Sequence, residues 1–383
     1  MHATILLADR VRPGPLRLLA CLLVCGVLGA CAGSPPSMQE MMPAPAVAGE
    51  EAGSVDLPIA EGNTALLDIL YATNRAPAGA DDEQAFYTNE RGYLVRLGSG
   101  RIAFGDSDIT WDEARKISLL KNRPGEFPLE IRDAAEYGIV PDSVSIFTPR
   151  GELDAIDESS DDRFVAAVEE RLARSDSKDV FIYVHGYKVE FENPLLVAAE
   201  MWHFLGYQGA FVAFSWPSTP SRLAYFKDTE TARVAAWGLR QLITYLARET
   251  SVERINIIGY SAGTRLVLTA MHELALIHQQ STPDEIVAAN RLGRVILVGS
   301  DVDSGTFASY VLDGLLRVQD QLNLYVSPAD KALKVSDKVL RHRRLGQVLP
   351  GTLDERMREF VMSTDRLHFV DVEDADQFDE GNG

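Results

Sequence analysis

Short apolar segments alternate with amphipathic ones from about residue 64 onward. The run Val180-Phe181-Ile182-Tyr183-Val184 consists only of apolar and aromatic residues, which is typical of a strand buried on both faces of a sheet. The stretch 229–248 instead repeats its apolar residues at helical spacing. This alternation predicts an α/β fold, with a mostly parallel central sheet and helices on both faces.

Individual elements follow from the same pattern. The predicted strands cover residues 66–72, 93–104, 180–184, 210–214, 255–258, 295–298, 322–326 and 368–372. The predicted helices cover residues 163–173, 194–205, 229–248, 262–277, 307–318 and 331–340. Residues 107–160 contain Pro124, Pro128, Pro141 and Pro149 and are expected to form an irregular surface excursion.

The first thirty residues have the pattern of a targeting segment. Arg10, Arg12 and Arg17 precede the apolar run 18–30, which is too short to span the roughly 30 Å hydrocarbon core of a bilayer. The run ends in Leu28-Gly29-Ala30-Cys31, which resembles the bacterial lipobox. We therefore expect residues 1–30 to be a lipoprotein signal peptide and Cys31 to carry the lipid. The alternative is an ordinary cleaved signal in which Cys31 is incidental.

Residues 31–62 have no apolar periodicity and are rich in Ala, Pro, Gly, Ser and acidic residues, as expected for a flexible tether. Residues 63–383 then form the folded domain. This organisation predicts a bacterial envelope protein that a lipid anchor attaches to the membrane, with the domain on the non-cytoplasmic side.

Composition excludes several classes of function. The chain has 37 Lys and Arg against 56 Asp and Glu, and a net charge of -19 disfavours a nucleic-acid partner. The three cysteines are Cys21, Cys25 and Cys31, so the domain has no thiol for catalysis or metal binding. His272 and His278 share a predicted helix but point in different directions, so no metal site is expected. No phosphate-binding glycine loop is present, and no cofactor is expected.

The pentapeptide Gly259-Tyr260-Ser261-Ala262-Gly263 lies between a predicted strand and a predicted helix. This context is typical of the nucleophile elbow, a sharp turn that exposes a serine at a helix N-terminus. Backbone N–H groups there can stabilise developing negative charge. Ser261 is therefore the candidate nucleophile, and the alternative is a serine that only caps the helix.

A second stretch, Val184-His185-Gly186-Tyr187, ends a predicted buried strand. Hydrolases with a nucleophile elbow place the second oxyanion-hole amide after such a strand, so the N–H groups of Tyr187 and Ala262 are expected to hold the oxyanion. His185 is expected to shape this loop through hydrogen bonds rather than to carry a proton.

A catalytic triad on such a fold runs Ser, then acid, then His along the chain, so an acid and a histidine are sought after Ser261. Asp330 follows the predicted strand 322–326 and is the favoured acid, although Ser327 and Asp330 also match a helix-capping pattern. Asp301 and Asp303, which follow the preceding strand, are the alternatives.

Only two histidines follow Asp330. His342 lies in a basic cluster typical of a solvated surface, and His368 begins a strand, at the wrong end for an active-site loop. The sequence therefore does not identify a base.

Several of these stretches, together with Tyr71-Ala72-Thr73-Asn74-Arg75 and Phe214-Ser215-Trp216-Pro217-Ser218, resemble the bacterial alpha/beta hydrolases of unknown function grouped as DUF900, in the esterase/lipase superfamily. The resemblance covers residues 64–376 and implies an α/β-hydrolase fold, a Ser261 nucleophile and a late acid. It also implies a catalytic His on a Gly-His segment after the last strand. Because this sequence ends at Gly383, either that segment lies beyond it or the protein lacks the residue.

The expected function is a serine hydrolase of the envelope that acts on an ester or similar acyl bond in a small-molecule or lipid-like substrate. Ser261 attacks, the Tyr187 and Ala262 amides stabilise the oxyanion, and Asp330 orients a His. The alternative is a non-catalytic lipoprotein that uses the same fold for binding or scaffolding.

The lipid anchor can be tested directly. Cys31→Ser should release the protein from the membrane fraction or stall its processing, because stable attachment needs the two or three acyl chains of a lipidated cysteine. Fractionation and incorporation of labelled palmitate measure both effects. Unchanged membrane attachment of the variant would contradict the prediction.

Overall fold

The computed structural model of the chain describes residues 39–42, 66–79, 86–105, 109–118, 120, 127–153, 161–219, 225–327, 344–348 and 355–372. The strands are β1 (Gln39–Glu40), β2 (Leu66–Pro77), β3 (Tyr87–Phe104), β4 (Pro128–Ile139), β5 (Asp179–Val184), β6 (Ala210–Ser215), β7 (Arg254–Tyr260), β8 (Leu292–Val298), β9 (Gln321–Val326) and β10 (Leu367–Asp371). The α-helices are α2 (Trp111–Ser118), α3 (Arg150–Leu153), α4 (Asp161–Ala173), α5 (Glu192–Phe204), α6 (Tyr225–Glu249), α7 (Gly263–Ile277), α8 (Pro283–Asn290), α9 (Ser304–Leu312) and α11 (Glu355–Ser363). Three short 3₁₀ helices are η2 (Pro141–Ser143), η4 (Leu315–Arg317) and η5 (Leu345–Gln347).

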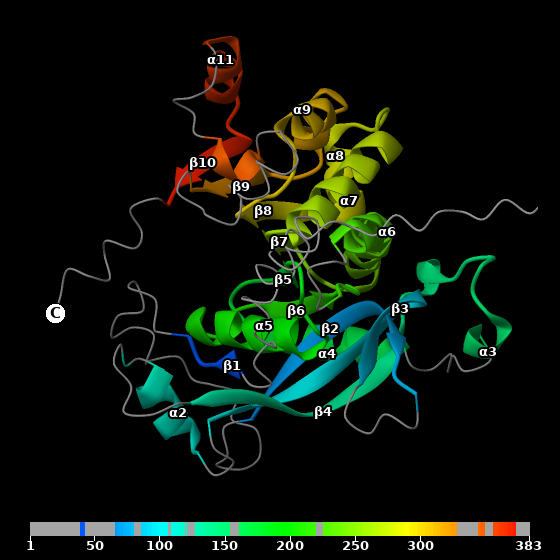
Figure 1. The fold of residues 1–383 in the computed structure, drawn as a ribbon, viewed down its shortest axis with the longest axis vertical. Coiled ribbons are helices and arrows are strands. Elements are labelled where there is room, and N and C mark those ends of the chain that lie inside the picture. The colour runs from blue at the N-terminus through cyan, green and yellow to red at the C-terminus, as the bar shows by residue number, and fades with distance from the viewer. Residues whose placement is uncertain are drawn as a thin grey trace, which may run out of the picture. The chain divides into compact units, whose positions relative to one another are not determined.

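The strands within these ranges form one sheet in the order β1-β4-β3-β2-β6-β5-β7-β8-β9-β10 (Figure 1). All pairs from β2 across to β10 are parallel, whereas β3 and β4 join the other end as antiparallel strands. The predicted mostly parallel α/β fold is confirmed. Because carboxyl ends of parallel strands meet at one edge, the loops after β5, β7, β8 and β9 share that edge, where the candidate residues lie.

Alternate residues of the central strands pack into two separate cores, one on each face of the sheet. In β6, Val212 and Phe214 belong to the core that includes α6 and α7, whereas Phe211 and Ala213 belong to the core that includes α5. Each buried Val or Phe side chain of this kind contributes on the order of 2 kcal/mol of burial free energy. No helix in the described ranges is both long and apolar enough to cross a membrane.

Most predicted elements are confirmed to within a few residues, but the prediction for residues 107–160 is wrong. This segment contributes α2 and a full strand, β4, which pairs antiparallel with β3. Pro128 is the first residue of β4, a position that tolerates proline. Few β4 side chains are buried, so the strand carries almost none of the apolar alternation by which strands are recognised.

Two further differences concern helices. Helix α8 was not predicted, although Thr282 and Glu285 form a capping box at its start, with Thr282 Oγ1 accepting from Glu285 N at 3.3 Å. The predicted helix 307–318 is divided into α9 and η4, with Gly314 between them at a φ of +98°. The predicted helix 331–340 lies outside the described residues.

Part of the segment expected to be a tether contacts the domain. Gln39 pairs with Leu129 of β4, and Met41 is buried. The carboxylate of Glu200, which is fully buried in α5, accepts hydrogen bonds from Gln39 Nε2 at 3.2 Å and from the Met42 backbone N–H. Residues 39–42 are therefore part of the sheet layer rather than of a free linker.

Candidate active site

Ser261 occupies a sharp turn between β7 and α7. Its φ is +50°, in the left-handed region that residues other than glycine rarely adopt. Its N–H donates to Val298 O of β8 at 2.9 Å, and its carbonyl accepts from Thr264 N at 3.0 Å. These bonds hold the residue at the carboxyl edge of the sheet and at the N-terminus of α7, where the backbone has the conformation of a nucleophile elbow.

The turn is possible only because glycines leave room for neighbouring backbone. A Cβ added at Gly263 would lie 2.3 Å from His185 O and 2.6 Å from Val184 O. A Cβ at Gly186 would lie 3.2 Å from the Ser261 Cβ. The loop after β5 therefore packs directly against the elbow, and Ser261 is brought beside the His185-Gly186-Tyr187 stretch.

The two candidate oxyanion amides belong to these two segments. Ala262 is the N-cap of α7, and Tyr187 lies in the loop after β5; both residues line one pocket. Within the part of the chain that the structure describes, the Ala262 N–H donates to no acceptor. It is thus available to hold an oxygen placed in the pocket.

A buried arginine braces the loop after β5. Arg75, at the end region of β2, is fully buried, and its guanidinium donates to Val189 O at 2.7 Å and to Ser215 Oγ at 3.0 Å. The Ser218 hydroxyl holds the same residue of the loop, accepting from Val189 N at 3.0 Å and donating to Val189 O at 2.8 Å. Burial lowers the pKa of Arg75 to about 9, and the carboxylates of Glu192, Glu190 and Asp228 oppose that change.

His185 is locked against Trp216. The two rings stack with centroids 5.2 Å apart and planes at 9°, and Trp216 Nε1 donates to His185 O at 2.8 Å. The His185 ring nitrogens face Gly186 O at 2.8 Å and Trp216 O at 3.0 Å. Burial, reinforced by the charge of Arg75, lowers the pKa of His185 to about 3. Only one nitrogen of a neutral imidazole carries a proton to donate, so the ring holds the loop through one of these carbonyls, and burial opposes the uptake of a second proton.

The candidate acids differ in what holds them. Asp301 lies in the loop after β8, and its Oδ1 and Oδ2 accept from Arg265 Nε at 2.9 Å and 3.0 Å. Its backbone carbonyl accepts from Arg265 and Arg344. Asp303 caps α9 by accepting from Thr306 N at 2.9 Å. Asp330 lies outside the described residues, in the segment that follows β9.

No histidine of the described ranges contacts the Ser261 hydroxyl, which has no hydrogen-bond partner there. His368 is the second residue of β10, at the amino end of the parallel strands and therefore opposite to the elbow. His342 lies outside the described residues. The remaining described histidines contact other elements: His203 contacts Ser118 and Tyr207, His272 contacts Asp313, and His278 contacts Ser281.

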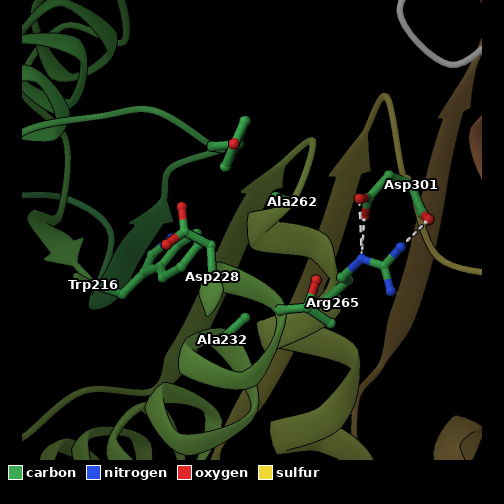
Figure 2. Close-up of a pocket in the computed structure, with 8 residues that line it drawn as sticks. Trp216, Asp228, Ala232, Ala262, Arg265 and Asp301 are labelled. Atoms are coloured by element: carbon green, nitrogen blue, oxygen red, sulfur yellow. Dashed lines mark hydrogen bonds and ion pairs between the residues drawn. The ribbon is translucent and has the colours of Figure 1, made fainter. Parts of the chain in front are cut away.

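A pocket opens beside the elbow. Figure 2 shows its lining, which is contributed by the loops after β5, β6 and β8 and by the first turns of α6 and α7. The lining residues are Tyr187, Trp216, Asp228, Thr229, Ala232, Ala262, Arg265 and Asp301. Sequence reasoning did not select Asp228, because an acid in the first turn of a helix is ordinarily explained by the helix dipole. No group of acidic, His or Cys side chains in the described ranges could hold a metal ion.

The strand order, the elbow and the adjoining loop together define an α/β-hydrolase fold. Residues 160–381 match the family model described as "Alpha/beta hydrolase of unknown function (DUF900)", and the chain belongs to this family.

Comparisons with curated proteins and with solved structures give no close match. No curated protein matches the sequence significantly. A solved structure, the Thermogutta terrifontis esterase 2 phosphoramylated by tabun, is 14% identical and covers 51% of this chain and 71% of its own, with a TM-score of 0.26. A likeness this remote carries no conclusion about activity.

The packing at the elbow gives a stability prediction. Gly263→Ala should lower the free energy of unfolding by about 3 kcal/mol or more, because backbone atoms on both sides of the new methyl group cannot move apart easily. Gly259→Ala is the matched control: the tight contacts of its Cβ would be with side-chain methyl groups, Val267 Cγ2 at 3.1 Å and Leu297 Cδ2 at 3.2 Å, and its nearest backbone atom would lie at an ordinary 3.5 Å. Urea unfolding measures both. Equal losses for the two variants would show that the contact with the loop after β5 is not the constraint.

Proposed function

We propose that the protein is a serine hydrolase that cleaves an ester or similar acyl bond. The observation that carries the proposal is the conformation of Ser261, held at a φ of +50° between a buried strand and a helix N-terminus. In the proposed reaction the Ser261 oxygen bonds to the acyl carbon and its proton passes to a base. The bond to the leaving group then breaks as that group takes the proton, and water releases the acyl group in a second step.

Two backbone amides are proposed to stabilise the negative oxygen of the intermediate. The packing of Gly186 against Ser261 supports the choice of Tyr187 N–H, and the unused Ala262 N–H at the start of α7 supports the other. Loss of one such donor typically costs about 10² to 10³ in turnover. The bracing of Val189 by Arg75 and Ser218 would keep the Tyr187 amide in place.

Asp330 remains the proposed acid that orients a catalytic histidine. It follows β9, one strand beyond β8, which is the usual position of the acid in this fold. The alternatives already have other partners: Asp301 pairs with Arg265, and Asp303 caps α9. Their engagement favours Asp330 for the role.

A non-catalytic binding function is the second candidate. The observation that favours it is that no described histidine contacts the Ser261 hydroxyl. In that case the pocket beside Ala262 would bind a ligand without cleaving it.

The proposed location is the bacterial envelope, with the domain attached through lipidated Cys31. The lipobox-like ending of the N-terminal apolar run supports this proposal. The proposed substrates are small-molecule or lipid-like acyl compounds, and the high negative charge argues against nucleic acid as a partner.

Reactivity of Ser261 separates the two candidate functions. A fluorophosphonate probe should label the full protein at Ser261, and Ser261→Ala should abolish the labelling, because the probe needs an activated nucleophile. Ser309→Ala, which alters an exposed serine of α9, should leave labelling unchanged. The probe is preferable to slow ester turnover, since an oxyanion hole and binding alone can give roughly 10³ over water. Absence of Ser261 labelling would favour the binding function.

The position of the acid can be tested by measuring the turnover of an activated ester. Asp330→Asn should lower turnover of an activated ester by on the order of 10⁴, because an amide favours the wrong imidazole tautomer. Asp301→Asn and Asp303→Asn should cost far less activity per folded molecule, with circular dichroism used to correct for unfolded protein. If a folded Asp301 or Asp303 variant were instead the inactive one, the acid would follow β8.

A further inference from the structure

The pocket beside Ala262 contains a buried carboxyl group that the proposed acyl chemistry does not use. Asp228, in the first turn of α6, is only 3% exposed. Asp228 and Trp216 both line the pocket (Figure 2). An acid that only stabilised the helix dipole would do so equally well in solvent.

The hydrogen bonds of Asp228 come from neutral groups. Oδ2 accepts from Thr219 N at 2.9 Å, and Oδ1 accepts from Thr219 Oγ1 at 2.9 Å. Each carboxylate oxygen can accept a second hydrogen bond, so acceptor capacity remains on the pocket side.

The positively charged side chains around Asp228 bind other groups: Lys227 pairs with Glu90, and Arg75 donates to Val189 O. No Lys, Arg or His nitrogen of the described residues forms an ion pair with it. Arg265 lines the same pocket but directs its guanidinium to Asp301, away from Asp228 (Figure 2). Lys227 and Arg75 act on the carboxylate only through space, and burial outweighs them, so the pKa of Asp228 is raised.

A carboxylate buried without an ion-pair partner is costly in free energy, and such groups concentrate at functional sites. A cation in the pocket would relieve this cost. Trp216 and Tyr187 line the same pocket, and aromatic rings attract cations that lie against their faces.

The remaining acceptor capacity of Asp228 favours one kind of cation. A primary ammonium group has three N–H donors, so it can pair with the carboxylate and also donate hydrogen bonds to it. A trimethylammonium group carries the same charge but has no N–H to donate.

We propose that Asp228, with Trp216 and Tyr187, forms a subsite for a primary ammonium group. The substrates are then acyl compounds that carry an –NH₃⁺ a short distance from the scissile bond, since Ala262 of the proposed oxyanion hole lines the same pocket. The substrate class rests on the proposed function, whereas binding of an ammonium group to the subsite needs no catalysis.

Binding is therefore measured without turnover. Ligand-observed NMR on the full protein would compare n-butylammonium, n-butanol and n-butyltrimethylammonium, which share a chain and differ in charge or head size. Butylammonium should bind at least about tenfold more tightly than each of the other two. Asp228→Asn should remove this preference, because it removes the negative charge. Glu230→Gln, an exposed carboxylate on the same turn of α6, should keep it.

Ala232→Leu gives an independent readout if Asp228→Asn does not fold. Ala232 lines the pocket, so a larger side chain should fill it and abolish butylammonium binding. Equal binding of butylammonium and butanol, or a preference that survives in folded Asp228→Asn, would overturn the proposal. Ser261→Ala should bind butylammonium like the unmodified protein. Binding in a protein whose Ser261 is never labelled would refute the hydrolase while leaving the subsite intact.

Discussion

The contact on which the candidate site depends is the one between the backbone of the β5 loop and the first residue of α7. The carbonyl oxygens of Val184 and His185 lie so close to Gly263 that no side chain fits there. This approach brings two segments, far apart in sequence, to one side of Ser261. It also brings a residue from each segment, Tyr187 and Ala262, into the lining of one pocket. Without it, the elbow and the loop would be separate features of two strands.

Residues 71–75 and 214–218 hold that loop in place. The sequence identifies both stretches through the family resemblance but does not show what they do. Thr73 Oγ1 donates to Ser215 O at 2.6 Å, and Arg75 continues the connection from β2 through Ser215 to Val189. The β2 motif and the β6 motif thus serve one purpose: they fix the backbone after β5. A buried guanidinium is expensive, and here several neutral oxygens surround it in place of one carboxylate. Such an arrangement makes the loop rigid, because each donor must keep its acceptor.

The elements that could be predicted from sequence are those whose structure is determined by their own residues and their immediate neighbours in the chain. The central residues of β5, β6 and β7 are mostly apolar because both faces of the sheet are covered there, and Ser261 is recognisable from the glycines at its own turn. β4 could not be recognised, since its place in the sheet comes from pairing with β3 rather than from its own mostly exposed side chains. Asp228 could not be recognised for a related reason, because its environment depends on the loop after β6, where Thr219 donates a hydrogen bond to it.

The left-handed backbone at Ser261 has a consequence for how this protein could change over evolutionary time. A side chain in that conformation costs on the order of 1 kcal/mol or more relative to glycine, so a single change to glycine would make the fold more stable. Selection for folding stability alone would therefore favour glycine at this position. A lineage that retains serine there is one in which the hydroxyl group still contributes to fitness.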